Sequence, residues 1–503
     1  MPSSSAEAGF PVCDSSASMT ADACSELYTL APVERHVRFD EDDTSGANVL
    51  SRALPLASIR GEDEQSTSDV QTKERKYTVW GGLRATSFAS WITIFLISAV
   101  PAGFAVKYTD QSPVITFAVN FVAIIPLGHI LDAVTEELVI RRGGHEGMLI
   151  VITFGYAQST IMRAYAKDTG SSNVVQLVIT IIALIKHQTP IVQTSLIGAV
   201  ISNSVLMVGI GFFFGGINRL EQNFNPSTVG SSLNELALSV AALILPTAMN
   251  TFSTLGTNER LMAEFSRGEA ILLLLSYICF CHYCYKTHSA MFTEPHQRAE
   301  LRRVKAHHGD AEKGIAQIGA SLAASAGGAT GENVLMRRAQ EIPLPKMSQP
   351  ALGSTLIIVT MFLGFNTTFA VDSIDGLTQR TVLTQNFVGL VLLPLLGCNP
   401  HSVILAAKDE MPTSFAISIS SSIQLLLGIL PLAVIIGWIR HDDSMTLLFD
   451  GFQVVSLAVS ILVLKYITDD GKSNWLDGVV LIALYAIIAL NAWITPDPVL
   501  GRG

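Results

Sequence analysis

Two groups of uncharged polar side chains interrupt long apolar stretches, and they are the residues best placed to do chemistry. The first group is Asn173 and Gln176, followed by Gln193, Ser195, Ser202 and Asn203. The second group is Asn399, His401 and Ser402, followed by Ser418, Ser420, Ser421, Ser422 and Gln424. Polar groups are costly in hydrocarbon and usually face a bundle interior or an ion path. The duplicated set favours a cation pathway, although any single member is more typical of hydrogen bonding between helices.

The elements that must hold these side chains follow from composition. The chain has 503 residues, of which 49% are hydrophobic and only 15% are charged, and its mean hydropathy is +0.43. A soluble domain carries about 25% charged residues. The sequence therefore predicts an all-α polytopic membrane protein. It argues against a soluble enzyme, a coiled coil and a secreted disulfide scaffold, and it shows no nucleophile–base set or phosphate loop.

Apolar stretches near the 20 residues needed to cross a bilayer recur along the chain. Eleven are predicted, at 88–106, 113–131, 148–186, 191–214, 232–249, 269–286, 352–371, 383–406, 414–438, 446–466 and 475–494. A long polar loop separates the first six from the last five. Since one polar group lies on each side of that loop, we expect an inverted repeat of two five-helix halves plus an N-terminal extra helix. The ion site of such a repeat lies where the halves meet.

The chain divides into five segments. Residues 1–76 are rich in Ser, Ala, Asp and Glu and predict a disordered cytosolic tail, either simply solvated or regulatory. The first membrane half is predicted at 77–286, a cytosolic loop at 287–350, the second half at 351–495, and a short C-terminal tail at 496–503. Basic residues are more numerous on the side that holds the N-terminus and the long loop, which predicts a cytosolic N-terminus.

Charge limits the partners. The net charge of −10 is unlike the clustered basic surface of a nucleic-acid-binding protein. Asp132, Glu136 and Glu137 follow the second predicted span at the cytosolic edge. Glu136 and Glu137 could form an acidic entry that collects cations. They could equally be solvated or paired with Arg141 and Arg142, and the sequence does not decide between these interpretations.

Over residues of about 90–495 the chain resembles the vacuolar-type calcium/proton exchangers of the cation/calcium exchanger superfamily. The matching stretches are Thr135–Leu138, Ile191–Gly198, Ser202-Asn203, Ser266–Gly268, Val371–Thr378, Ser421–Gln424, Met445–Asp450 and Asp470–Leu476. The resemblance implies a cation/proton antiporter of an endomembrane, the vacuolar membrane first among them. It implies transported Ca²⁺ and H⁺ rather than a tightly bound cofactor. Its partners would be the lipid bilayer, cations and protons, and a homo-oligomer stays open.

The two ion-binding motifs of that family are altered here. The first reads Gly-Asn-Ala-x-Glu-Leu, and it is matched by Gly155 followed, after an insert at 156–172, by Asn173–Leu177. Gln176 then stands in place of the acid. The second reads Gly-Asn-Ala-Ala-Glu-His, where this chain has Gly397–Ser402. The insert is either a retained in-frame intron, which a transcript sequence would test, or a real broken helix lining a cavity.

These replacements change the expected ion chemistry. Ca²⁺ prefers several hard oxygen ligands, carboxylates among them. Asn173, Gln176 and Asn399, the predicted Ca²⁺ ligands, offer only amide oxygens, and His401 can take a proton near neutral pH but binds Ca²⁺ poorly. One hypothesis is an antiporter whose substrate is Ca²⁺ or has drifted toward a monovalent cation or Mn²⁺. The other is a non-transporting homologue that acts as a membrane scaffold or regulator.

Overall fold

A computed structural model describes residues 91–109, 111–142, 173–252, 259–288, 291–292, 348–398 and 400–495. The predicted tail at 1–76, the insert at 156–172, most of the loop at 287–350, the tail at 496–503 and Asn399 lie outside the described residues. The predictions made for those segments therefore remain predictions. The described part of the chain is helical apart from one short two-stranded sheet, in which Gln222 pairs with Ser473.

The helices follow the predicted spans closely. The first half contains α3 (Trp91–Tyr108), α4 (Pro113–Arg142), α7 (Val174–Ile185), α8 (Thr189–Ile201), the π-helix η3 (Ser202–Met207), α9 (Val208–Gly216), β1 (Gln222–Asn223), α10 (Pro226–Phe252), α11 (Glu259–His282) and η5 (Tyr283–Thr287). The second half contains α15 (Gln349–Asp372), α16 (Ile374–Arg380), α17 (Gln385–Phe387), η6 (Val388–Leu392), α18 (Leu393–Leu395), α19 (Pro400–Ala407), α20 (Met411–Ile423), η7 (Gln424–Ile429), α21 (Leu430–Ile439), α22 (Gly451–Thr468), β2 (Lys472–Ser473) and α23 (Trp475–Ile494).

Among the described residues, 8 helices are long and apolar enough to cross a membrane, or 9 if the pair around 385–407, bent by 54°, is one span. The predicted count of eleven is not confirmed. The two remaining predicted spans correspond to α3 and to α7, and α7 has only 12 described residues. The fold class is confirmed as a polytopic helical membrane protein.

Two spans in different halves of the chain are built alike. Both α8 and α20 are 13 residues long, and each continues as a π-helix, from Ser202 in the first half and from Gln424 in the second. Each is preceded by a tight turn whose central residue, His187 or Asp409, has a positive φ of 57° or 69°. Ser202 and Gln424 are 222 positions apart, and so are His187 and Asp409. Positive φ is uncommon outside glycine, so the shared turn indicates a structural repeat.

These two spans run in opposite directions. At one end, Gln222 lies just beyond α9 and donates from Nε2 to Ala406 O (3.2 Å) and to Asp409 Oδ1 (2.8 Å). The end of the first span therefore lies beside the start of the second. At the other end, the hydroxyl of Thr189 at the start of α8 lies 2.9 Å from the hydroxyl of Ser444, beyond α21. Antiparallel copies of one unit are an inverted repeat, as predicted.

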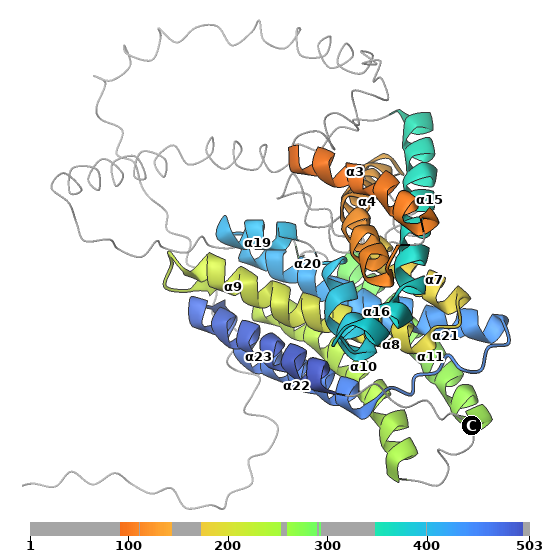
Figure 1. Cartoon of the computed structure of the whole chain (residues 1–503). Helices are drawn as coiled ribbons and strands as arrows, with labels where there is room; N and C mark the ends of the chain where they lie inside the picture. The colour runs from red at the N-terminus through yellow and green to blue at the C-terminus, as the bar shows by residue number, and fades with distance from the viewer. Residues whose placement is uncertain are drawn as a thin grey trace, which may run out of the picture. The chain divides into compact units, whose positions relative to one another are not determined.

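The helices that pack against these two spans are related by the same inverted repeat. α9 packs against α23, and its repeat-related partner α21 packs against α11, while α10 and α22 pack against each other (Figure 1). Close approach requires small residues, because a Cβ on Gly478 of α23 would lie 2.7 Å from Gly209 O of α9. The predicted N-terminal extra helix is α3. It packs on α4 and α15, where the rings of Phe104 and Phe369 meet edge to face at 5.3 Å.

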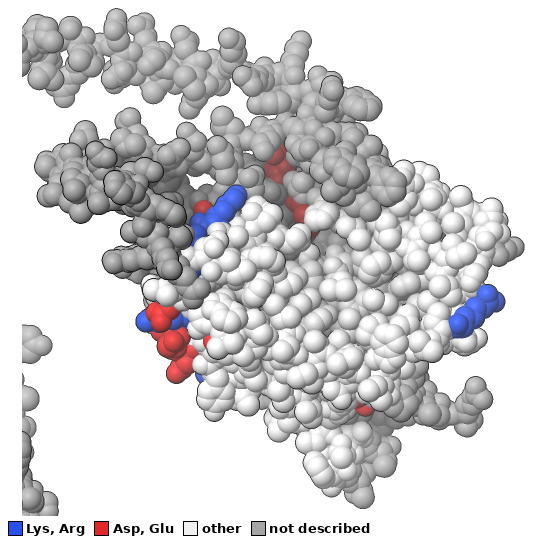
Figure 2. All heavy atoms as spheres, turned by 60° about the vertical axis from the view of Figure 1, so that its left-hand side comes forward, with Lys and Arg blue, Asp and Glu red and all other residues white. Residues whose placement is uncertain are grey.

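The outer surface agrees with a lipid environment. Figure 2 shows a broad described face that is almost free of charged side chains, with Lys, Arg, Asp and Glu gathered at its margins. Large apolar side chains are exposed on the outer helices, for example Leu272 on α11, Leu462 on α22 and Leu490 on α23. A soluble protein rarely exposes contiguous apolar surface of this extent. We take this face to be the one that contacts acyl chains.

The start of α23 offers a test of local stability. Asn474 accepts hydrogen bonds from the backbone N–H groups of Leu476 (2.8 Å) and Asp477 (3.1 Å), and the Asp477 carboxylate accepts from Asn474 N (3.0 Å). We expect Asn474→Ala to lower the free energy of unfolding by about 1 kcal/mol, because the capping acceptor is lost. Thermal unfolding in detergent measures this change. Asn474→Asp keeps the acceptor and should stay close to the unsubstituted chain, and equal losses from both variants would contradict the capping role.

Candidate ion-pathway site

A network of buried amides lies where the two repeats cross. Asn173 precedes α7, and its side chain, 3% exposed, donates from Nδ2 to Ser421 O (2.9 Å) and to Gln424 Oε1 (2.8 Å). Gln424 is the first residue of η7, so this contact joins the first half of the chain to the second. Asn173, Ser421 and Gln424 were all predicted site residues, and the structure brings them together.

Gln176 lies one turn further along α7. Its side chain is 1% exposed, and Nε2 donates to Ser195 Oγ on α8 at 3.1 Å. Ser195 in turn donates to Val192 O (3.2 Å). Gln176 Oε1 has no hydrogen-bond partner in the described part of the chain, and it lies 4.0 Å from the position of a Cβ built on Gly397. A buried acceptor without a donor is costly, so this oxygen is a candidate cation ligand.

The π-helices place further polar groups in the same layer. Ser202 Oγ lies 3.2 Å from the hydroxyl of Tyr485 on α23 and also contacts the thiol of Cys398. Ser422 Oγ donates to Val200 O at 3.4 Å, which again joins repeat-related positions. π-helical turns often occur at functional sites because they realign side chains that a regular helix would not bring together. Cys398 and Tyr485 belong to this layer and were not predicted.

Two cavities flank the network. The small cavity, about 310 Å³, is lined by Ile125, Gly128, His129, Asp132, Val175, Met207, Leu395, Leu396, Gly397, Cys398 and Pro400. The large cavity, about 570 Å³, is lined by Pro190, Ile191, Gln193, Thr194, Thr247, Asn250, Thr251, Gln385, Asn386, Leu448, Phe449, Asp450, Gly451 and Gln453.

The cavities lie toward opposite ends of one spanning helix. Thr194 in α8 lines the large cavity and Met207 in η3 lines the small one, which places them roughly 20 Å apart at 1.5 Å per residue. Gln176 directly follows Val175 of the small cavity, and Ser195 directly follows Thr194 of the large one. The Gln176–Ser195 hydrogen bond therefore connects the borders of the two cavities.

The remaining predicted residues have mixed outcomes. Asn203 is buried in η3. His401 is half-buried on α19, whereas the residue related to Gln176 by the 222-residue repeat is Cys398. The motif comparison that aligned His401 with the family's acid is therefore offset from the structural repeat by one turn of helix.

Gln193 donates to Thr446 O and Leu448 O, both at 3.0 Å, and faces the large cavity rather than the amide network.

The residues of the predicted acidic entry lie on α4, which extends beyond the predicted span. α4 continues through Arg142, so Glu137 lies on the helix and is 6% exposed rather than solvated at its end. The side chain of Glu136 lies outside the described residues. The carboxylate that lines the small cavity is that of Asp132, with His129 beside it. The apolar stretch alone ends the span near 131 and so places these groups just beyond it, at the cytosolic edge.

No cluster of three or more His, Cys, Asp or Glu residues that could hold a metal occurs among the described residues. The centre of the site is thus built from neutral amides and hydroxyls. Amide and hydroxyl oxygens can coordinate a cation, but they neither neutralise its charge nor release a proton. Charge and protons must come from the cavity-lining residues, among which His129 and Asp132 line the small cavity and Asp450 lines the large one.

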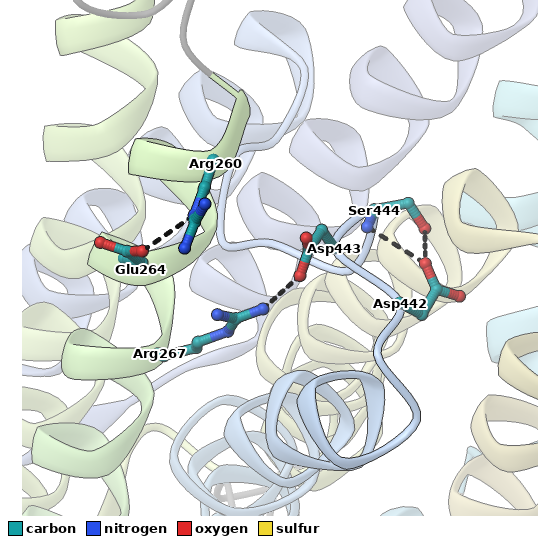
Figure 3. A network of polar contacts seen from close by, with 6 residues as sticks. All are labelled: Arg260, Glu264, Arg267, Asp442, Asp443 and Ser444. Atoms are coloured by element: carbon teal, nitrogen blue, oxygen red, sulfur yellow. Dashed lines mark hydrogen bonds and ion pairs between the residues drawn. The ribbon is translucent and has the colours of Figure 1, made fainter.

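A loop at 440–450 covers one end of α8 beside the large cavity. Arg267 pairs with Asp443, and the hydroxyl and backbone N–H of Ser444 donate to Asp442 Oδ1 at 2.6 and 3.1 Å (Figure 3). Arg267 also packs over the ring of Trp438 at 5.3 Å. His187 Nδ1 lies 3.0 Å from the other Asp442 oxygen. The loop, which belongs to the second half of the chain, is therefore anchored by Arg267 and His187 from the first half.

This anchor gives a pH prediction. Hydrogen bonds from Ser444, then from His187, hold the pKa of Asp442 below its ordinary value of 3.8. A lowered folded pKa contributes stability that is full above the ordinary pKa and is lost as pH falls through the lowered one. Asp442→Asn should therefore be less heat-stable than the unsubstituted chain at pH 5, and the difference should shrink from about pH 4 to pH 2. Ser444→Ala should remove most of that pH dependence, and a difference that widens on acidification would contradict the assignment.

The fold and site together define a class: a polytopic transporter with an inverted repeat and a polar centre between two cavities. The family model for sodium/calcium exchanger proteins matches residues 169–286 and 352–494, more than half of the chain. The chain belongs to this family.

Relatives and solved structures agree. The chain is 28% identical over 479 residues to the vacuolar calcium ion transporter of Cryptococcus neoformans var. grubii, covering 83% of this chain and 76% of that protein. It is 28% identical over 420 residues to the Ca²⁺/H⁺ antiporter of Synechocystis sp., covering 82% of this chain and 99% of that protein. The structure of native YfkE superposes with a TM-score of 0.57 at 21% identity, covering 80% of this chain and 99% of that one. At that identity the match shows the fold alone.

Proposed function

We propose that this protein is a cation/proton antiporter that moves Ca²⁺ across an endomembrane in exchange for protons. The observation that carries the proposal is the Gln176–Ser195 hydrogen bond, which lies between the borders of two cavities toward opposite ends of one span. The relatives named as calcium transporters and Ca²⁺/H⁺ antiporters support Ca²⁺ as the first cation to test. The non-transporting scaffold is the second candidate, favoured by the neutral centre.

The chemistry divides between centre and cavities. A cation that reaches the centre would be coordinated by Gln176 Oε1 and the neighbouring hydroxyls, and breaking the Gln176–Ser195 contact would let it pass. Protons cannot be held by Asn173, Gln176 or Gln424, because their side chains do not titrate. We therefore assign proton binding to Asp132 and His129 in the small cavity. A cation entering there would displace protons from these groups by charge repulsion.

Location and orientation form part of the same proposal. The vacuolar relatives support the vacuolar membrane. A cytosolic N-terminus would place the start of α4 and the large cavity on the lumenal side and the small cavity on the cytosolic side. A homo-oligomer is compatible with the apolar outer face, and crosslinking in membranes would test it.

One assay separates antiporter from scaffold. Purified protein is reconstituted into vesicles, an acid interior is imposed, and ⁴⁵Ca²⁺ uptake is followed for the unsubstituted chain, Gln176→Glu and a form lacking 156–172. Uptake that stops when a protonophore collapses the gradient supports antiport and excludes the scaffold. If every form is silent for Ca²⁺, Mn²⁺, Na⁺ and K⁺, transport is the hypothesis to abandon.

A further inference from the structure

The large cavity holds features that the exchange at the centre does not use. It is formed by four segments that are distant in sequence: the start of α8, the end of α10, α17, and the loop leading into α22. Its volume of about 570 Å³ is far more than a bare ion occupies. Since one water molecule takes about 30 Å³ of liquid volume, the space accommodates an ion together with part of its hydration shell.

Two of the amides that line this cavity use their nitrogens in hydrogen bonds to the protein. Gln193 Nε2 donates to two backbone carbonyls, Thr446 O and Leu448 O, at 3.0 Å each. Only the nitrogen of an amide can donate to carbonyl groups, so these contacts fix which end of the side chain is which. Gln385 Nε2 likewise donates to Asp375 Oδ1 (2.9 Å), outside the cavity lining. In both side chains the donor nitrogen is used by the protein, so the oxygen is the end that would meet a ligand.

Gln453 on α22 supplies the second, independent indication. Its side chain is 4% exposed and lines the cavity, with Nε2 directed to Asn386 Oδ1 at 3.5 Å. Gln453 Oε1 is buried and finds no hydrogen-bond partner among the residues that the structure describes. An acceptor buried without a donor costs free energy unless a ligand or an ordered water satisfies it.

The charge of the cavity selects the sign of the ligand. Of the described residues that line it, Asp450 alone carries a formal charge at neutral pH. One Asp450 oxygen accepts from Phe452 N at 3.0 Å as the N-cap of α22, which fixes the carboxylate at the cavity rim. Carboxylate and amide oxygens are the ligands that hard metal cations prefer. An anion would instead be repelled by the Asp450 carboxylate, the one formal charge among the described lining residues.

We propose that the large cavity is a second cation-binding site, in which Asp450, Gln193 and Gln453 hold a partly hydrated metal cation at the entrance to the transport path. The site concentrates cations beside Thr194 and Ser195, the residues that border the central contact. Its place on a transport path rests on the proposed antiport, but its ability to bind a cation does not.

Direct binding tests the site apart from transport. ⁴⁵Ca²⁺ binding is measured on the full-length purified chain carrying Gln176→Leu, so that the centre lacks its own oxygen ligand. Asp450→Asn on that background keeps the helix cap and removes the charge, and we expect about a fivefold weaker affinity for Ca²⁺. Gln453→Leu should weaken it about threefold through the lost oxygen, and Gln453→Glu should strengthen it. The matched control is Asp443→Asn, which removes one carboxylate from the same loop outside the cavity lining.

The outcomes separate this proposal from the previous one. A loss of Ca²⁺ affinity in Asp450→Asn but not in Asp443→Asn supports the site, even if no form of the protein transports. Equal effects of the two substitutions would show a general surface-charge effect and overturn it. Unchanged binding in both Asp450→Asn and Gln453→Leu, or no binding to the Gln176→Leu chain at all, also overturns it, even where the unsubstituted chain transports Ca²⁺.

Discussion

Gln176→Leu should abolish proton-driven cation uptake, by at least about 100-fold, while leaving the amount of folded protein in the membrane nearly unchanged. Leucine fills a similar volume. The Ser195 hydroxyl loses the hydrogen bond that it accepts from Gln176, but it keeps the one that it donates to Val192 O. Gln176 Oε1 has no donor among the described residues. Its removal therefore costs the folded state little, but it deletes the oxygen that lies between the two cavities.

Thr180→Val provides the matched control. Thr180 lies one turn further along α7, is also 1% exposed, and its hydroxyl is likewise without a partner in the described part of the chain. If transport depended only on the polarity of α7, both substitutions would impair it equally. We expect Thr180→Val to retain uptake, measured in the same vesicles with the same quantity of reconstituted protein. Substantial uptake by Gln176→Leu would remove Gln176 from the path.

Gln176→Glu tests the sign of the charge argument. A carboxylate in this position restores the negative charge that the resembling exchangers carry in their first motif. Even at an effective dielectric constant of about 20, a charge a few ångströms from a divalent ion is worth several kcal/mol before desolvation. We therefore expect the Ca²⁺ concentration for half-maximal uptake to fall by at least about tenfold. An unchanged concentration would mean that the cation does not approach the Gln176 side chain.

The spans and the repeat could be predicted because the bilayer imposes them locally. Each span needs about 20 apolar residues, and such stretches are visible in the sequence. The paired polar groups also predicted that Asn173 and Gln424 lie together, since an inverted repeat brings its equivalent helices to one centre. A further signal was available in the sequence and was missed. Lys186 and Lys408 both stand four positions before a proline, and this pattern marks the repeated turn.

The cavities could not be predicted, because each depends on how helices pack. The large cavity draws Thr247, Gln385 and Asp450 from three separate elements, and no spacing along the chain connects them. Asp132 was expected just beyond the second span, at the cytosolic edge, because hydropathy ends a span where charge begins. The helix itself continues for further turns and carries Asp132 onto the cavity wall. The shift from His401 to Cys398 has a similar cause, since the repeat is set by the turn geometry rather than by the motif letters.

A close approach between the two halves predicts a large effect on folding. Gly389 in η6 lies against α8, where an added Cβ would overlap Thr194 Oγ1 and lie 2.7 Å from Thr194 Cβ. We expect Gly389→Ala to destabilise the protein by about 3 kcal/mol or more, because the overlap is with a fixed Cβ and not only with a movable side-chain end. The yield of monodisperse protein and its thermal midpoint in detergent measure the loss. Gly230→Ala on α10 is the control, because nothing lies within 4 Å of a Cβ there.

A compensating exchange distinguishes steric overlap from a requirement for glycine itself. Thr194→Gly removes both atoms that the new Cβ would meet, and the next neighbour, Ser195 N, is at 3.7 Å, an ordinary contact. Alone it should cost about 1 kcal/mol through helix propensity and the lost hydrogen bond to Pro190 O (2.8 Å). Combined with Gly389→Ala it should restore most of the lost stability, so the double variant is more stable than Gly389→Ala alone. If the two losses simply add, overlap with Thr194 is not what makes Gly389 necessary, and the close helix contact is not what holds the repeats together.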